Sequence, residues 1–330
     1  MAYTAIDDPE AYFQAKLYTG DGASTLAITG VGFQPDFTWI KCRTISHNHT
    51  VYDSVRTATK VLESNLNNAE ATRANSLKSF DTDGFTLGDW DNVNDASDPF
   101  VGWNWKESAT AGFDIVAYTG NGTDDTDISH SLSAVPHVMI VKNRTSAHGW
   151  NVYHHKNTSA PETDYLSLDE NGGTNDSANS WSDEAPTSSV FTLGGGNGTN
   201  KNTDSLIAYL WSEKQGFSKF GKHSGNGNAD GVFVYTGFKP AMIICKRYDS
   251  TGSWTIHDNK RNAYNGLGAT LYPHLNNGED SGEARSMDFL SNGFKFRGTD
   301  EGNVSGEDYI TIAFAEAPFV NSNGVPCNAR

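Results

Sequence analysis

The sequence has too few cysteines to be held together by disulfide bonds. Its 330 residues contain three, Cys42, Cys245 and Cys327, and none of them forms a Cys-x-x-Cys pair. An odd number of widely separated cysteines argues against both a disulfide framework and a cysteine-based zinc site. Cys42 and Cys245 each lie in an apolar run, so we expect both to be buried free thiols.

Long apolar runs and an excess of positive charge are also missing. No stretch approaches the roughly 18 apolar residues of a membrane-spanning helix, and the first residues lack the basic start and apolar centre of a secretory signal. The net charge is −16, from 24 Lys and Arg against 40 Asp and Glu. An acidic surface repels phosphate backbones and anionic membranes. We therefore expect synthesis and folding in the cytoplasm, and neither nucleic acid nor membrane as a partner.

Helical periodicity is scarce, and only residues 69–78 could form a helical turn or two. Aromatic residues make up 12% of the chain, with 8 Trp, 13 Tyr and 17 Phe, a composition unlike that of disordered chains. Short β-branched and aromatic runs alternate with clusters of Gly, Asn and Asp, which supply the backbone conformations of tight turns. The sequence thus predicts an all-β protein.

An internal repeat is the strongest pattern in the sequence. A Phe leads into an Asn-Gly or Asp-Gly turn at Phe13, Phe113 and Phe217. In each unit a Pro then precedes an apolar run that ends in Lys and Arg. A Gly-Phe or Val-Phe strand follows later, and the unit closes with a Trp- or Phe-containing strand that ends in Glu. These landmarks recur in the same order at nearly constant spacing. We therefore predict three units at 1–111, 112–215 and 216–330, the last with a C-terminal tail.

Each unit is predicted to contain about seven short strands. In the second unit we expect them at 113–119, 127–132, 137–142, 150–154, 164–168, 189–193 and 205–212. This number favours a jelly-roll-like β-sandwich, with a blade-like or trefoil arrangement as the alternative. The joints near 108–112 and 214–217 are very short, so the three sandwiches should pack together, around a pseudo-threefold axis, instead of hanging as beads.

Charged pairs recur at matching places in the units. Lys41 with Arg43, Lys142 with Arg144, and Lys246 with Arg247 follow the apolar run. They fit either a repeated ion pair between units or the recognition of carboxylate or sialic-acid-like groups. Asp53 with Arg56 and Asp258 with Arg261 also match, whereas the second unit has His154 and Asn157 there. These pairs fit a structural salt bridge in a turn or a ligand site absent from the second copy.

Metal and aromatic ligand sites are the other candidates. The histidines are not spaced as zinc ligands. Asp89–Asp95 and Asp124–Asp127 are rich in oxygen ligands, so Ca²⁺ is a possible cofactor, although neither follows the twelve-residue calcium loop. No other cofactor is expected. Trp181 lies in an Asn- and Ser-rich loop and has no matching Trp in the other units, so we expect it to face outward and contact a ligand or a neighbouring subunit.

The sequence carries no motif of a known catalytic site. It lacks a nucleophile elbow, and Gly194–Gly198 lies between two predicted strands, as a turn does, and not where a phosphate-binding loop would lie. A pair of carboxylates for glycoside hydrolysis could be drawn from the 40 acidic residues, but the sequence does not select one. We therefore expect a non-enzymatic protein.

Several of these motifs together resemble a repeat family of tailed, often marine, bacteriophages. They are the Met-Ala-Tyr-Thr-Ala-Ile-Asp-Asp-Pro opening, Tyr-Thr-Gly-Asp-Gly, Gly-Phe-Gln-Pro-Asp-Phe-Thr-Trp-Ile-Lys, Val-Tyr-Asp-Ser-Val-Arg and Asp-Gly-Phe-Thr-Leu-Gly. The resemblance implies a tail-fibre or structural protein of the virion, assembled in the host cytoplasm, and offers no catalytic residues.

The expected partners are other capsid or tail proteins, further copies of the chain in a homo-oligomer, and host surface glycans. A host-contacting appendage is the first expectation, a capsid-decorating protein the second, and a polysaccharide depolymerase the third.

Overall fold

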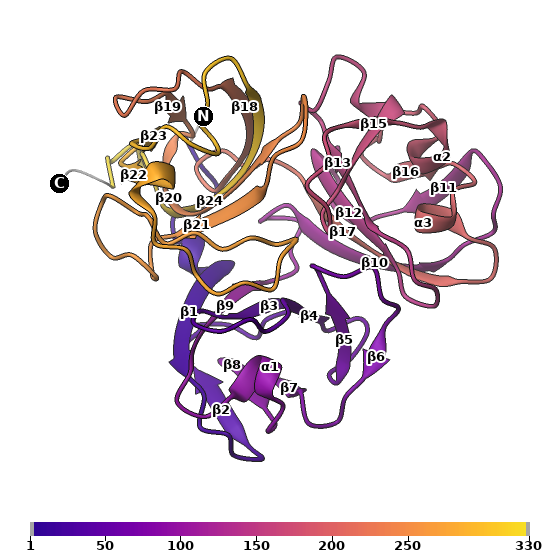
Figure 1. Ribbon diagram of the computed structural model, residues 1–330. Helices are drawn as coiled ribbons and strands as arrows, with labels where there is room; N and C mark the ends of the chain where they lie inside the picture. Colours follow the sequence, from indigo (N-terminus) through magenta and orange to yellow (C-terminus); the bar gives the residue numbers. More distant parts are fainter. Residues whose placement is uncertain (1–2, 328–330) are drawn as a thin grey trace.

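The computed structural model describes residues 3–327, so the outermost ends of the first and third predicted units lie outside the described residues. Strands dominate the chain and pair antiparallel throughout the described sheets, which confirms the all-β prediction. Figure 1 shows three lobes around a common centre. We call residues 3–111, 112–215 and 216–327 the first, second and third segments.

The first segment contains a six-stranded sheet and a three-stranded sheet. The larger sheet has the order β1-β9-β3-β4-β5-β6 and the smaller one β2-β8-β7. The strands are β1 (Phe13–Thr19), β2 (Leu26–Thr29), β3 (Phe37–Cys42), β4 (Thr50–Asp53), β5 (Lys60–Glu63), β6 (Ala71–Thr72), β7 (Leu77–Asp81), β8 (Gly84–Leu87) and β9 (Pro99–Trp105), with short helices η1 (Pro9–Ala11) and α1 (Asp91–Asn94).

The second segment has the same strand order in its larger sheet, β10-β17-β12-β13-β14-β15, and a two-stranded sheet of β11 and β16. Its elements are β10 (Phe113–Thr119), β11 (Thr126–Ser129), β12 (Val138–Asn143), β13 (Trp150–His154), η2 (Pro161–Thr163), β14 (Asp164–Ser167), β15 (Asn175–Asp176), α2 (Ala178–Trp181), β16 (Val190–Leu193), α3 (Asn197–Asn200) and β17 (Ser205–Trp211). The seven predicted strands are present within a few residues, and β15 was not predicted.

The third segment keeps the first four positions of that order, β18-β24-β20-β21, beside a smaller sheet β19-β23-β22. Its elements are β18 (Ser218–Ser224), β19 (Phe233–Tyr235), β20 (Phe238–Arg247), β21 (Trp254–Asp258), η3 (Glu283–Arg285), β22 (Met287–Leu290), β23 (Gly293–Phe296) and β24 (Asp308–Pro318). The third segment therefore shares this part of the strand order with the other two.

Each larger sheet packs one face against the smaller sheet of its own segment. In the first segment, Ile40 and Phe100 of the larger sheet share a buried cluster with Phe85 and Leu87 of the smaller sheet. The second segment has a matching cluster between its two sheets. Alternation along each strand sends every second side chain into this sandwich core.

The opposite faces of the larger sheets meet in a central aromatic core. Trp105 lies 6.4 Å from Trp211 and 5.4 Å from Phe314, measured between ring centroids, so the three segments meet at these rings. Phe13 and Phe113 lie beside them, each 4.8 Å from the neighbouring tryptophan, the first ring tilted and the second stacked. Truncating a buried aromatic of this kind costs about 3 to 5 kcal/mol, so the central core fixes the lobes relative to one another.

The turn after the first strand of each segment is closed by a buried asparagine. Asn94, Asn200 and Asn303 are fully buried. Each accepts a hydrogen bond from the backbone of the turn, at 2.8, 2.9 and 3.1 Å. Gly22 and Gly122 in these turns have φ of +66° and +70°, where a Cβ is strained. Asn94, one of the possible calcium ligands, therefore has a structural role.

The one helical expectation was wrong. Residues 69–78 contain β6 and the start of β7. β6 pairs with β5 at Lys60 and Val61, and this sheet pairing overrides a weak local helical preference.

Candidate binding sites

Asp53 and Arg56 form a buried ion pair at the joint between the first and second segments. Asp53 ends β4, and its Oδ1 accepts the backbone N–H of Arg56 at 2.7 Å while its Oδ2 pairs with Arg56 Nε. Both side chains are fully buried. Tyr209 of the second segment donates its hydroxyl to Asp53 Oδ2 at 2.7 Å. The pair thus helps to hold two segments together.

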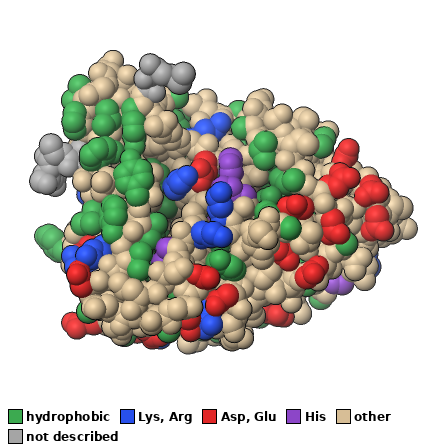
Figure 2. Space-filling model, turned by 90° about the horizontal axis from the view of Figure 1, so that it is seen from above, with side chains coloured by type: hydrophobic (Ala, Val, Ile, Leu, Met, Phe, Trp, Pro, Cys, Tyr) green, Lys and Arg blue, Asp and Glu red, His purple; other side chains and the backbone are tan. Residues whose placement is uncertain are grey.

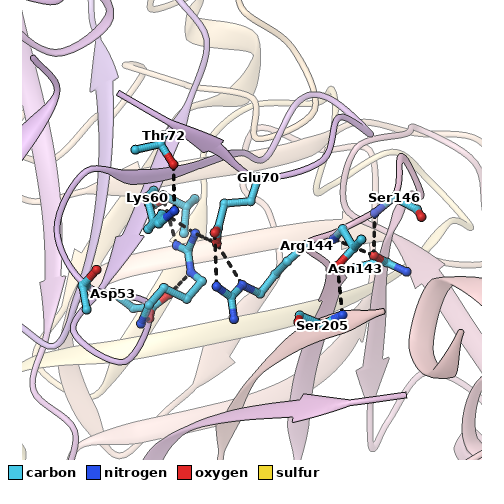
Figure 3. Close-up of polar contacts among 12 residues, drawn as sticks. Asp53, Lys60, Glu70, Thr72, Asn143, Arg144, Ser146 and Ser205 are labelled. Atoms are coloured by element: carbon cyan, nitrogen blue, oxygen red, sulfur yellow. Dashed lines mark hydrogen bonds and ion pairs between the residues drawn. The ribbon is translucent and has the colours of Figure 1, made fainter. Parts of the chain in front are cut away.

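Glu70 extends this ion pair across the joint, as Figure 3 shows. It accepts Arg56 Nη1 at 3.1 Å, and Arg144 of the second segment binds both carboxylate oxygens at 2.9 and 3.1 Å. Burial alone would raise the pKa of Glu70, but hydrogen bonds and charge from Arg144 and Arg56 hold it below the ordinary value. The predicted ion pair between units is therefore present at Arg144.

The joint between the third and first segments repeats the arrangement. Asp258 Oδ2 accepts Arg261 Nε at 2.6 Å, and Arg261 reaches Glu279 at 3.2 Å. Arg43 of the first segment binds both oxygens of Glu279 at 2.9 and 3.1 Å. Trp103 of the first segment donates to Asp258 at 3.0 Å. Although burial opposes ionisation, Arg261 keeps the pKa of Asp258 below its ordinary value.

The joint between the second and third segments uses neutral groups. Thr174 stands where the other joints have Glu70 and Glu279. Its hydroxyl oxygen lies 2.8 Å from both Asn157 Oδ1 and the Tyr248 carbonyl, and its one O–H donates to either of them. His154 is fully buried and its Nε2 lies 3.3 Å from the Thr311 carbonyl. Burial lowers the pKa of His154 to about 3.

Arg247 is one residue out of register with Arg43 and Arg144, whose place in the third segment is taken by Tyr248, and it pairs within its own segment. Arg247 binds Asp249 at 2.8 Å and also Glu307. Arg43 and Arg144 therefore hold joints, whereas Arg247 at its shifted position does not.

The lysines of the repeated pairs are fully buried and donate to carbonyl oxygens. Lys142 reaches Asn67 of the first segment at 2.9 Å, and Lys246 reaches Asn171 of the second at 3.2 Å. Lys41 donates to Cys42 at 2.7 Å. Burial lowers the pKa of each lysine to about 8. Since these donors are used inside the protein, the lysines of the charged pairs offer no open surface to an acidic ligand.

Asp53, Arg56, Asp258 and Arg261 were candidate ligand-binding residues, and the structure places all four side chains in the interior of the joints. A ligand in solvent does not reach them in this conformation. The structural interpretation of the pairs therefore accounts for every contact they make.

The prediction that Trp181 faces outward is wrong. Only 1% of Trp181 is exposed. The short helix α2 turns its ring inward, where it contacts Tyr153 at 5.9 Å and donates Nε1 to the Asp164 carbonyl at 2.9 Å. The loop around Trp181 is on the surface, but burial of this large ring anchors the loop to the second sandwich core.

The possible calcium ligands are bonded to the protein itself. Asp95 pairs with His47, Asp124 accepts the Gly195 backbone N–H, and Asp127 accepts the Thr192 hydroxyl. Within residues 3–327, no three His, Cys, Asp or Glu side chains are grouped so that they could hold a metal ion. Cys42 and Cys245 are buried free thiols, as predicted.

A surface pocket of about 400 Å³ lies in the second segment, beside β13, β14, α2 and α3. Its size is within the range of small-molecule sites. Polar side chains dominate the lining, and they include Asn151, Tyr165, Glu170, Asn179 and Asn197. Asn151 donates to Ser180 at 3.2 Å. The side chains of Tyr165, Asn179 and Asn197 make no hydrogen bond to another described residue.

A corresponding pocket of about 390 Å³ in the third segment is bonded internally. Arg285 pairs there with Asp280 at 2.7 Å and Asp300 at 2.9 Å, and Tyr272 donates to Asp280 at 3.0 Å. The second-segment pocket therefore has free amide and hydroxyl groups where the third-segment pocket has ion pairs. Free groups of this kind can bind the hydroxyls of a sugar.

The loop that the sequence singled out at Trp181 lines this pocket through other residues than Trp181. The pocket residues Ser177 and Asn179 belong to the Asn- and Ser-rich segment around Trp181. The abundance of asparagine was the available signal. The contribution of Asn151 and Tyr165 from β13 and β14 depends on sheet pairing, which a local pattern does not give.

Together these features define an all-β scaffold of antiparallel sheets with a shared aromatic core, closed joints and open polar pockets. The chain belongs to the family described as a domain of unknown function, DUF7483, whose model matches residues 8–318. No curated protein matches the chain. Among the described helices, none has the length and apolar character needed to cross a membrane.

Proposed function

We propose that this chain is a non-enzymatic structural protein of a bacteriophage particle that contacts glycans on the host surface. The observation that carries the proposal is the second-segment pocket, where Tyr165, Asn179 and Asn197 present unpaired polar groups on a scaffold closed by ion pairs and aromatic packing. Binding groups held on a rigid scaffold lose little conformational freedom when a ligand binds. The resemblance to phage repeat proteins supplies the expected setting.

The chemistry of the pocket favours neutral sugars. Asparagine amides donate and accept hydrogen bonds, as sugar hydroxyls do, and the Tyr165 ring adds an apolar surface. Glu170 is the acidic side chain in the lining, and a single exposed carboxylate is compatible with binding of hydroxyl groups.

Binding of the purified protein to a glycan array and to isolated host envelopes tests this function. We expect binding to neutral glycans that the double substitution Asn179→Ala and Asn197→Ala reduces about tenfold, as the loss of one or two hydrogen bonds implies. Asn68→Ala changes an exposed asparagine of the first segment and is the matched control. Absence of binding to every glycan and envelope preparation would contradict the proposal.

A capsid-decorating role is the second candidate, favoured by the compact ring of lobes in place of an extended fibre (Figure 1). Labelling the protein on intact particles and on empty heads distinguishes the two roles, since decoration predicts retention on heads and loss of capsid stability when the protein is absent. Release of reducing sugar from host polysaccharide would instead indicate a depolymerase.

A further inference from the structure

A second surface cavity, of about 470 Å³, lies between the second and third segments. Its lining includes His137, Glu213 and Lys219 near the short joint, and Tyr3 and Tyr235 from the opposite side. We call it the inter-segment groove. It is separate from the second-segment pocket, because the two share no lining residue.

The groove combines positive charge with unpaired donors. Lys219 binds Glu213 at 2.8 Å. Lys156, Lys214 and Lys219 are all close enough to His137 for their charges to oppose its protonation, and together with burial they lower the pKa of His137. These lysines place positive charge close to His137, against the negative charge of Glu213, in a chain of net charge −16.

His137 is held with one ring nitrogen toward the protein and the other free. Its Nδ1 accepts the Glu213 backbone N–H at 3.1 Å. The neutral ring therefore carries its proton on Nε2, and that nitrogen donates to no other described residue. A neutral histidine with a free N–H is a hydrogen-bond donor for an oxygen-rich ligand.

The opposite wall supplies an exposed aromatic surface that the other segments lack. Tyr235 lies in the edge strand β19 and is 56% exposed, and Tyr3 fixes the wall by donating to the Gly237 carbonyl at 2.7 Å. From the strand registers, the matching positions are Ser129 in β11 and Thr29 in β2. Figure 2 shows hydrophobic side chains on the left of this face, Lys, Arg and His near its middle, and acidic side chains at the right.

From this combination we infer that the inter-segment groove binds an acidic saccharide, with Lys219 pairing with the sugar carboxylate, His137 donating to a sugar oxygen, and Tyr235 covering an apolar sugar face. The inference rests on the proposed glycan-binding function and adds a second site and a different class of sugar. A lysine ion pair and an aromatic surface together distinguish an acidic sugar from a simple inorganic anion.

Calorimetry with the full chain tests the inference, using sialyllactose and trigalacturonate as acidic probes and lactose and maltotriose as their neutral counterparts. We expect tighter binding of at least one acidic probe than of its neutral counterpart, weakened by salt. Lys219→Gln and Tyr235→Ala should each weaken it about tenfold. Glu213→Gln should strengthen it, because Lys219 is released from its ion pair while the Phe220 N–H keeps an oxygen acceptor.

Two exposed residues outside the groove give matched controls. Lys260→Gln removes a lysine paired with Glu10 at 3.3 Å, and Tyr264→Ala removes a tyrosine that is 87% exposed. Both should bind the acidic probes as the unmodified chain does.

The inference is overturned if no acidic probe binds, if lactose or maltotriose binds as tightly, or if Lys219→Gln has no effect. The unmodified chain could bind envelopes through Asn179 and Asn197 and still bind no acidic sugar. That result would overturn the inference about the groove and leave the proposed function standing. If the unmodified chain binds neither host envelopes and neutral glycans nor the acidic probes, both proposals are contradicted.

Discussion

The three joints of the molecule solve the same packing problem with different chemistry. Two joints contain a buried Asp-Arg pair that continues through a glutamate to an arginine of the neighbouring segment. The joint between the second and third segments has His154, Asn157 and Thr174 at the matching positions. A buried charge needs its partner, whereas a neutral hydrogen bond loses less when it is broken. One backbone arrangement therefore tolerates both a buried ion pair and a set of neutral hydrogen bonds.

The largest difference in stability between the joints should follow from breaking the buried Asp53–Arg56 pair. Asp53→Ala leaves Arg56 and the Tyr209 hydroxyl without their partner, and we expect a loss of about 3 to 5 kcal/mol in the free energy of unfolding. Asn157→Ala, at the position that matches Arg56, should cost about 1 kcal/mol. Denaturant titration of both variants measures the difference, and equal losses would contradict the contrast between the joints.

Acid should affect the neutral joint before the ionic joint at Glu70. His154 has a pKa of about 3 in the folded protein and an ordinary value of about 6.5 when unfolded. The unfolded chain therefore binds more protons between these values, and stability falls as the pH falls below about 6.5, by about 2 kcal/mol at pH 5 for this group. The lowered pKa values of Glu70 and Asp258 act only at lower pH, below their ordinary values.

His154→Gln isolates the contribution of this residue, because other buried histidines also titrate. We expect the stability lost between pH 7 and pH 5 to be smaller in this variant by about 2 kcal/mol. Hydrogen exchange at pH 5 should show faster opening beside β13 and β24 than at the Glu70 joint. An unchanged pH dependence in His154→Gln would refute the prediction.

Removing the charge that crosses an ionic joint should have an intermediate effect. Glu70→Gln weakens the contacts to Arg56 and Arg144, and we expect a loss of about 2 kcal/mol because hydrogen bonds to charged groups are the stronger ones. Thr174→Val, its counterpart in the neutral joint, should cost about 1 kcal/mol. Thermal unfolding shows which of the two variants loses more stability. A larger loss in Thr174→Val than in Glu70→Gln would show that charge does not strengthen the joint.

The smallest effect is expected at Arg247. Its ion pairs with Asp249 and Glu307 lie within the third segment and near the surface, where such pairs contribute about 0 to 1 kcal/mol. Arg247→Gln should therefore leave the unfolding midpoint nearly unchanged, while Arg144→Gln lowers it. Comparable losses in both variants would show that contact across a joint does not set the contribution of these arginines.

Several features of the fold followed from local patterns in the sequence. Strands of the second segment were predicted within a few residues because alternation, β-branched residues and Asn-Gly turns act over short distances. The free buried cysteines followed from their apolar surroundings. The ion pair of Arg144 with another segment was anticipated because Lys-x-Arg recurs at one strand position in the first two segments, although the sequence did not name Glu70 as the partner.

Other features depended on contacts between residues far apart in the chain. Trp181 was expected at the surface because its loop is polar, yet the large ring gains more by packing against Tyr153. The residues at 69–78 form strands because β5 offers a pairing edge. The second-segment pocket was missed because it combines Asn151 and Tyr165 with side chains from α2 and α3.

The amino-acid sequence by itself determined the all-β class, the strand positions and the turns, because these depend on side-chain alternation and backbone preferences of neighbouring residues. Only the tertiary structure decided which charges are buried partners, which tryptophan is hidden and which polar groups remain free for a ligand. Burial and pairing are properties of residues brought together from distant segments, and no short stretch of sequence contains them.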